Sequence, residues 1–182
     1  SARAGPGLST AVAARMALRN VADALIEREN LGLDFASWRL GLEQRDGGAG
    51  YDEIILANDS IFGPFADISP FLARLRDPAS PFLGLTLSLE VEPHVQSFFM
   101  GFNMSRFPRL VFDDFWDGVR PLTNKRAIIE NYEIGLSRRI AEAGIPLSAV
   151  FDMRAAPCPS AASLICQVAP EKPSLARIRA LW

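Results

Sequence analysis

The stretch YDEIILANDS, residues 51–60, decides the fold, because it predicts a β-strand that stops at a polar tripeptide. The run Ile54–Ala57 is apolar at successive positions, which is expected when helices cover both faces of a sheet. The strand stops at Asn58, Asp59 and Ser60. Because ligands of open α/β sheets bind at the carboxyl ends of strands, this tripeptide is a candidate site.

Predicted helices and strands alternate around this stretch. Periodicity and breakers predict helices over residues 10–21, from 34 to the glycines at 47–50, and over 68–76, 108–119 and 124–143, with strands over 83–89, 96–102 and 147–151. Residues 22–28 extend the first helix or form a short strand, and 174–182 form a short helix. The alternation predicts an α/β fold with a mostly parallel central sheet and helices on both faces, in a single domain over residues 1–182.

The composition excludes several classes of protein. With 49% hydrophobic residues among 182, the chain is not a disordered one, and its formal net charge of -2 argues against a nucleic acid partner. No apolar run approaches the length of a membrane-spanning helix, and the start does not resemble a signal peptide, so we expect a cytoplasmic protein. Only Cys158, Cys166 and His94 are available as soft ligands, which argues against a disulfide framework or a structural zinc site.

Two polar clusters could hold a nucleotide. Asn30 and Asp34 lie where a loop enters a helix, and they could bind a base or a ribose by hydrogen bonds; alternatively, Asp34 only caps the helix. Asp59 could bind a divalent cation, Mg²⁺ or Mn²⁺, that in turn holds a diphosphate. Alternatively, Asn58 begins an Asx turn that leads into a Gly-Pro pair. The spacing alone leaves these alternatives open.

Two further clusters could act on the transferred group. His94 interrupts two apolar strands and could contact a phosphate or a sugar hydroxyl, although a lone histidine is also typical of an ordinary surface or hydrogen-bonded residue. Glu133, early in the predicted 124–143 helix, could be a general base toward a hydroxyl nucleophile. The alternative is an acidic residue placed favourably near a helix N-terminus. No GxxxxGK[ST], GxGxxG or GxSxG motif supports a different α/β enzyme.

Five segments together resemble the rhamnan synthesis protein F family, whose members build polysaccharides and are related to rhamnosyltransferases. They are ENLGLDFASWRLGL (29–42), YDEIILANDSIFGPF (51–65), HVQSFFMGFN (94–103), FW (115–116) and YEIGLSRRIAEAG (132–144). Their order and spacing match over roughly residues 29–151. The N-D-S-x-x-G-P and H-x-Q-S elements are fairly specific in combination, whereas each alone would be a weak signal.

The resemblance implies a GT-A-type fold, as in nucleotide-diphospho-sugar transferases. It places Asn58–Ser60 where related enzymes have an Asp-x-Asp motif, here with one carboxylate instead of two. It makes Glu133 the catalytic base and puts Asp34 near the nucleotide. The residues implied to line the donor or acceptor side are His94, Gln96 and Ser97.

The function implied by the resemblance is glycosyl transfer. The enzyme would move a rhamnose-type sugar from a nucleotide-sugar donor, such as dTDP-L-rhamnose, to a growing cell-surface polysaccharide on a lipid carrier, at the inner face of the cell membrane. The alternative is a non-catalytic binding module of the same fold in a polysaccharide assembly complex. Such folds normally open with a strand that this N-terminus lacks, so we expect the chain to be a domain of a longer protein.

Overall fold

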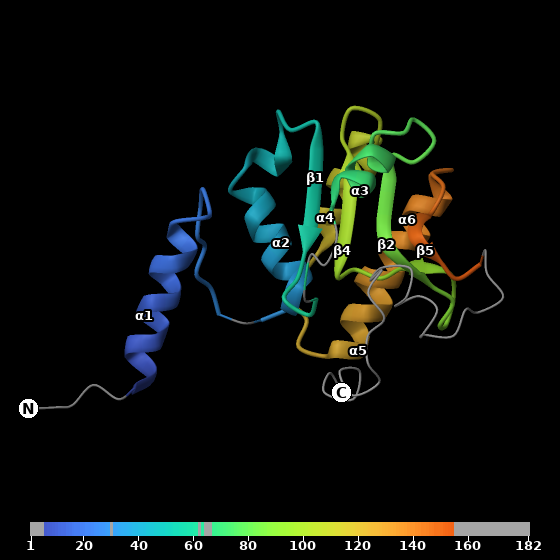
Figure 1. The fold of residues 1–182 in the computed structure, drawn as a ribbon. Coiled ribbons are helices and arrows are strands. Elements are labelled where there is room, and N and C mark those ends of the chain that lie inside the picture. The colour runs from blue at the N-terminus through green and yellow to red at the C-terminus, as the bar shows by residue number, and fades with distance from the viewer. Residues whose placement is uncertain (1–5, 30, 62, 64–66, 155–182) are drawn as a thin grey trace, which may run out of the picture. The chain divides into compact units, whose positions relative to one another are not determined.

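The computed structural model describes residues 6–29, 31–61, 63 and 67–154, and the chain divides into two compact units, Ser1–Asn30 and Leu31–Trp182 (Figure 1). The first unit contains helix α1 (Pro6–Arg19), which confirms the helix predicted there. An exposed ion pair joins Arg15 to Glu27 at 2.7 Å. Residues 22–28 are irregular, so they form neither the extension of the helix nor the short strand predicted for them.

The second unit alternates helices and strands as predicted. Its elements are α2 (Leu33–Glu43), the 3-10 turn η1 (Asp46–Gly48), β1 (Glu53–Ala57), α3 (Ser69–Leu75), β2 (Phe82–Ser88), β3 (His94–Val95), β4 (Phe99–Asn103), α4 (Arg109–Gly118), α5 (Lys125–Ile128), the π-helical turn η2 (Ile129–Ile134), α6 (Gly135–Glu142) and β5 (Ser148–Asp152). The short helix predicted at 174–182 lies outside the described residues. An α/β fold is therefore confirmed.

The sheet is mixed, and the prediction of a mostly parallel sheet is wrong. Strand β4 pairs antiparallel with both β1 and β2, β3 pairs antiparallel with β2, and β5 pairs parallel with β2. Only residues 89–93 separate β2 from β3, whereas a parallel return needs a crossover of about a dozen residues or more. The short connection therefore forces the chain to turn back antiparallel.

Three strands nevertheless point the same way. Because β4 is antiparallel to both β1 and β2, these two strands share a direction, and β5 is parallel to β2. The carboxyl ends of β1, β2 and β5 therefore lie toward one end of the sheet. That end is where an open α/β sheet places its ligands.

Helices cover both faces of the sheet, as predicted. On one face, α2, α4 and the α5–η2–α6 segment pack an aromatic-rich core against the sheet, with Phe35, Ile54, Phe82, Met100, Phe102, Phe112, Phe115, Trp116, Tyr132 and Ile140. On the other face, α3 packs Phe71 and Leu75 against Leu83 and Phe99. None of the described helices is long and apolar enough to cross a membrane.

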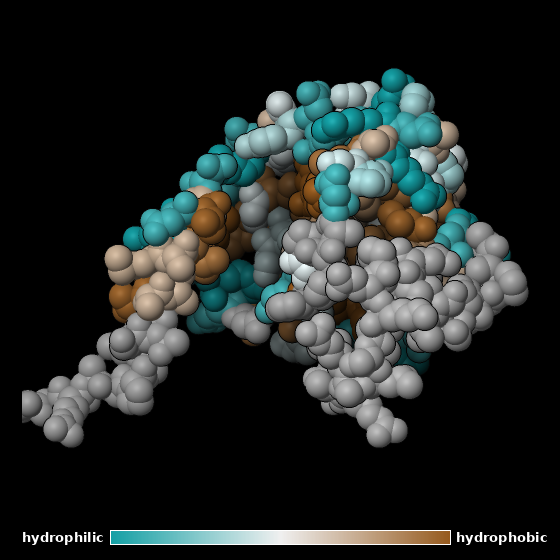
Figure 2. Space-filling model, in the orientation of Figure 1, coloured by the Kyte–Doolittle hydropathy of each residue, from teal (hydrophilic) through white to brown (hydrophobic). Residues whose placement is uncertain are grey.

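The edge strand β1 departs from its prediction. Among the described strands it pairs only with β4, and α3 packs its apolar side chains against β2 and β4. Ile54 and Leu56 are buried, but Ile55 between them is 38% exposed. The prediction that both faces of this run are covered is therefore wrong. Figure 2 shows hydrophobic surface (brown) lying among hydrophilic residues (teal) in this view of the protein.

Candidate functional site

Asn58 fixes the carboxyl end of β1 to three other parts of the chain. Its backbone N–H donates to the Phe98 carbonyl at 3.1 Å, and its Nδ2 donates to Asp34 Oδ2 at 2.9 Å. Its Oδ1 accepts from the Ser60 backbone N–H at 3.0 Å, which is the Asx turn that the sequence allows. The structure therefore brings together Asp34, Asn58 and Ser60, three of the predicted site residues.

Asp34 does not cap its helix, so that alternative is wrong. Helix α2 begins after Gly32, which occupies the N-cap position with φ 75 and provides no side-chain cap. A Cβ at Gly32 would lie 2.7 Å from Pro121 Cα, so both the backbone conformation and the packing require glycine there. Asp34 lies in the first turn of α2, where the helix dipole favours a negative charge, and its carboxylate reaches the end of β1.

Asp59 is exposed beside this pair. Among the residues that the structure describes, no group of three or more His, Cys, Asp or Glu side chains is placed to hold a metal ion. Mg²⁺ keeps several water ligands and is often bound by one or two carboxylates together with substrate phosphates. The side chains present therefore fit a cation only if phosphate oxygens and water complete its coordination.

A local irregularity shapes the segment that carries His94 and Ser97. Val95 lies opposite Leu87 and Met100 lies opposite Gly84, so the β3–β4 segment advances five residues while β2 advances three. The two extra residues form a bulge between β3 and β4. Bulges re-aim side chains and are common beside active sites. Here the bulge contains Ser97, and its last residue bonds Asn58.

Glu133 lies against this bulge. Its Oε2 accepts from the Ser97 backbone N–H at 2.8 Å and from Ser97 Oγ at 2.5 Å, while its Oε1 is 3.6 Å from His94 Nε2. His94 is buried, and its Nδ1 is 2.8 Å from the Glu92 carbonyl oxygen. The structure thus joins His94, Ser97 and Glu133. Because Ser97 precedes Phe98, this cluster adjoins the Asp34–Asn58 pair.

The helix predicted over 124–143 is interrupted where Glu133 lies. Asn124 caps α5 by accepting from the Ala127 N–H at 3.1 Å, and η2 then forms a π-helical turn before α6. Single π-helical turns inside α-helices are rare and frequently occur at functional sites. Glu133 bonds Ser97 on another element, so its role is not the helix N-terminal placement that the sequence left open.

The structure says less about Gln96 and Asn30 than about the other predicted residues, and sequence reasoning missed Ser137. Gln96 lies in the same segment and donates its backbone N–H to Thr86 O, and Asn30 lies outside the described residues. Sequence reasoning missed Ser137, whose Oγ accepts from the buried Val95 N–H at 3.0 Å. Because Ser137 follows Glu133 by four residues, the helical spacing could have placed both on one face.

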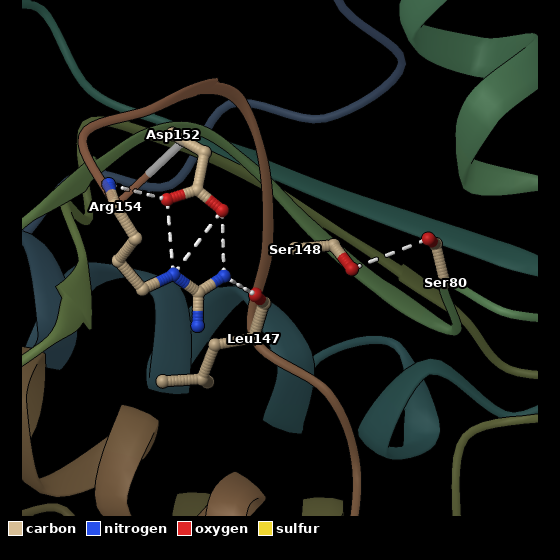
Figure 3. A network of polar contacts seen from close by, with 5 residues as sticks. All are labelled: Ser80, Leu147, Ser148, Asp152 and Arg154. Carbon is tan, nitrogen blue, oxygen red and sulfur yellow. Dashed lines mark hydrogen bonds and ion pairs between the residues drawn. The ribbon is translucent and has the colours of Figure 1, made fainter. Parts of the chain in front are cut away.

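Polar contacts lie at both ends of β5 (Figure 3). Arg154 contacts both carboxylate oxygens of Asp152 and donates to the Leu147 carbonyl at 2.6 Å, and Ser80 Oγ donates to Ser148 Oγ at 3.2 Å. The Arg154 hydrogen bonds hold the pKa of Asp152 below its ordinary value, opposed in part by burial. Arg154 therefore holds the Asp152 carboxylate near Leu147, the residue before β5.

Comparisons with known proteins agree with the resemblance drawn from the sequence. The family model described as "Rhamnan synthesis protein F" matches residues 8–166. "Virulence protein VirA" of Vibrio anguillarum is 34% identical over 119 residues, which cover 63% of this chain and 38% of VirA. "Uncharacterized protein y4gN" of Sinorhizobium fredii is 26% identical over 134 residues, which cover 70% of this chain and 34% of that protein. The chain thus spans less than two fifths of these relatives, and no solved structure matches it.

Proposed function

Because this chain belongs to the rhamnan synthesis protein F family, we propose that it helps to build a cell-surface polysaccharide as a glycosyltransferase domain. The donor in this proposal is a nucleotide-diphosphate sugar of the rhamnose type. The observation that carries the proposal is the junction of two clusters: Glu133 bonds Ser97, and the next residue, Phe98, bonds Asn58 at the end of β1. A carboxylate base is thereby held near a polar strand end.

The proposed chemistry is an inverting displacement. Glu133 Oε1 takes the proton from an acceptor hydroxyl as its oxygen bonds the anomeric carbon of the sugar. The bond between that carbon and the diphosphate oxygen breaks, and its electron pair leaves with the diphosphate. Because Ser97 donates both of its hydrogen bonds to Oε2, Oε1 is the oxygen that remains for the acceptor.

The donor side of the proposed site is the end of β1. Asp34 and Asn58, with Ser60 in the turn, would hold the nucleotide by hydrogen bonds, and Asp59 would lie near the diphosphate. A divalent cation held by Asp59 and the diphosphate would supply positive charge to the leaving group. The proposal includes a GT-A-type fold, in which these groups at the carboxyl end of β1 would occupy the position where α/β sheets bind ligands.

The proposed acceptor is a growing polysaccharide on a lipid carrier. Such an acceptor lies at the membrane surface, so the domain would work as a peripheral protein at the inner face of the cell membrane. Vesicles that contain the lipid-linked acceptor should therefore retain the purified protein in a flotation assay. Vesicles of the same lipids without the acceptor are the matched control.

The decisive experiment measures turnover and binding separately. Glu133→Gln should lower transfer from dTDP-L-rhamnose, tested with Mg²⁺ or Mn²⁺, by about 10²–10⁴-fold while nucleotide-sugar binding persists. Glu130→Gln is the control, because Glu130 lies on the same turn but pairs with exposed Arg126. Transfer by Glu133→Gln at the wild-type rate would refute the role given to Glu133.

A non-catalytic binding module is the second candidate. It is favoured by the single carboxylate at the end of β1 and by the internal contacts that already engage Asn58. Calorimetry with nucleotide sugars and Mg²⁺ or Mn²⁺ separates the two functions. Absence of binding at millimolar donor would favour the module.

A further inference from the structure

His94, the only histidine of the chain, is 4% exposed, and named groups face both of its ring nitrogens. Its Nδ1 is 2.8 Å from the Glu92 carbonyl oxygen. A carbonyl oxygen can only accept a hydrogen bond, so Nδ1 carries the hydrogen. In the neutral ring, Nε2 is then an acceptor, and it faces Glu133 Oε1 at 3.6 Å.

The two carboxylate oxygens of Glu133 have different surroundings. Oε2 receives both donors of Ser97, whereas Oε1 faces His94 Nε2, which is an acceptor in the neutral ring. At 3.6 Å the contact between Oε1 and Nε2 is longer than a hydrogen bond. Catalytic hydrogen bonds are often long without substrate and tighten in the reacting complex. If Oε1 carried a proton, it could donate a hydrogen bond to His94 Nε2.

We propose that His94 is a positioning residue that receives the proton from Glu133. The acceptor hydroxyl gives its proton to Oε1, Oε1 passes it to Nε2, and the carboxylate is restored beside a protonated ring. The proton then leaves to water when the product departs. This step rests on the proposed function only through the role of Glu133, since the ring geometry stands without it.

The other charged groups on the elements packed against β3 pair elsewhere or are exposed, so Glu133 is the partner of the His94 ring. Strand β3 packs against β2, η2 and α6, and β2 (FLGLTLS) has no charged residue. On η2, Glu130 pairs with Arg126. On α6, Arg138 pairs with the Glu92 carboxylate at 2.5 Å, and the exposed charges are Arg139 and Glu142. Glu133 is the carboxylate for which the structure gives a contact with the ring.

The first test reads the ring directly. Because the chain has one histidine, ¹⁵N NMR of the labelled full chain reports on His94 alone. In the neutral ring we expect hydrogen on Nδ1, with the Nε2 resonance moved by Glu133→Gln and left unchanged by Glu130→Gln. Hydrogen on Nε2 in the wild-type protein would overturn the proposal, whether or not transfer is detected.

The second test uses two amide replacements. His94→Asn keeps a donor near the Glu92 carbonyl and removes Nε2, whereas His94→Gln places an amide near the Nε2 position but cannot take a proton. Both should lower kcat by about 10²-fold with little change in KM or nucleotide-sugar binding. Wild-type kcat in His94→Gln would reduce the role to hydrogen bonding and overturn the proposal.

The two tests separate this inference from the proposed function. If the wild-type protein shows no transferase activity, the proposed function is wrong. The NMR result would still show which ring nitrogen of His94 carries the hydrogen. Conversely, a transferase with an Nε2-protonated ring would keep Glu133 as the base and lose His94 as its partner. If either replacement fails to fold, the wild-type spectrum remains decisive.

Discussion

Asn58 and Ser97 are the residues that assemble the proposed site. Asn58 joins the end of β1 to Asp34 through its side chain and to Phe98 through its backbone. Ser97, the preceding residue, donates twice to Glu133. The distance between the donor side and the base therefore depends on the backbone hydrogen bond between residues 58 and 98 and on the Ser97–Glu133 hydrogen bonds.

A single acidic residue should give stability a measurable pH dependence. Arg154 lowers the pKa of Asp152 from 3.8, so folding favours the ionised carboxylate. The stabilisation is complete above pH 3.8 and is lost as the pH falls through the lower folded-state pKa. Asp152→Asn should therefore reduce the free energy of unfolding by roughly 0.5–1 kcal/mol at neutral pH, and by progressively less as the pH falls through the lowered pKa of Asp152. Urea denaturation across this range measures it.

The partner variant provides the control for that experiment. Arg154→Gln should also reduce stability at neutral pH and by less in acid, but part of its loss should persist at low pH, because it also removes the hydrogen bond to the Leu147 carbonyl. A constant difference between wild type and Asp152→Asn at every pH would contradict the explanation.

At the scale of elements, the close approach of β2 and β3 is a sensitive feature. A Cβ on Gly84 would lie 2.0 Å from Val95 Cγ1, far inside van der Waals contact. Gly84→Ala should therefore destabilise the protein by about 1–3 kcal/mol. Adding Val95→Ala should cost less than the sum of the two single changes, because it removes the clash. Thermal and urea unfolding of the three variants measure this coupling, and simple additivity would rule it out.

Two other glycines should respond to alanine in opposite directions. Gly41 lies inside α2 and has no atom within 4 Å of an added Cβ, so Gly41→Ala should stabilise the protein by about 0.5–1 kcal/mol. An added Cβ on Gly101 of β4 would lie 2.8 Å from Leu75 Cδ2 on α3, so Gly101→Ala should be destabilising. Differential scanning calorimetry compares them, and shifts of the same sign would contradict this packing.

For the whole molecule, donor binding should raise stability. A ligand that binds only the folded chain at about 100 times its Kd adds about 2.7 kcal/mol to the free energy of unfolding. We expect dTDP-L-rhamnose to raise Tm with Mg²⁺ or Mn²⁺ present, and to do so in Glu133→Gln as well. Free rhamnose, which lacks the diphosphate, is the control. No shift at millimolar donor would argue against a nucleotide-sugar site.

Much of the architecture followed from local sequence patterns. Apolar periodicity and breakers predicted the elements of the second unit, because burial of one face and the geometry of turns act over a few residues. The short connection over residues 89–93 also contained the reason for the antiparallel return, although the alternation of elements led to a prediction of mostly parallel strands. Family membership likewise followed from motifs in the chain.

Only the tertiary structure decided which side chains meet. Asp34 and Asn58 are 24 residues apart, and Ser97 and Glu133 are 36 apart. Their contacts depend on how α2 packs beside β1, on the bulge between β3 and β4, and on the π-helical turn that contains Glu133. No local pattern specifies these features, because each arises from packing between distant segments that must share one core.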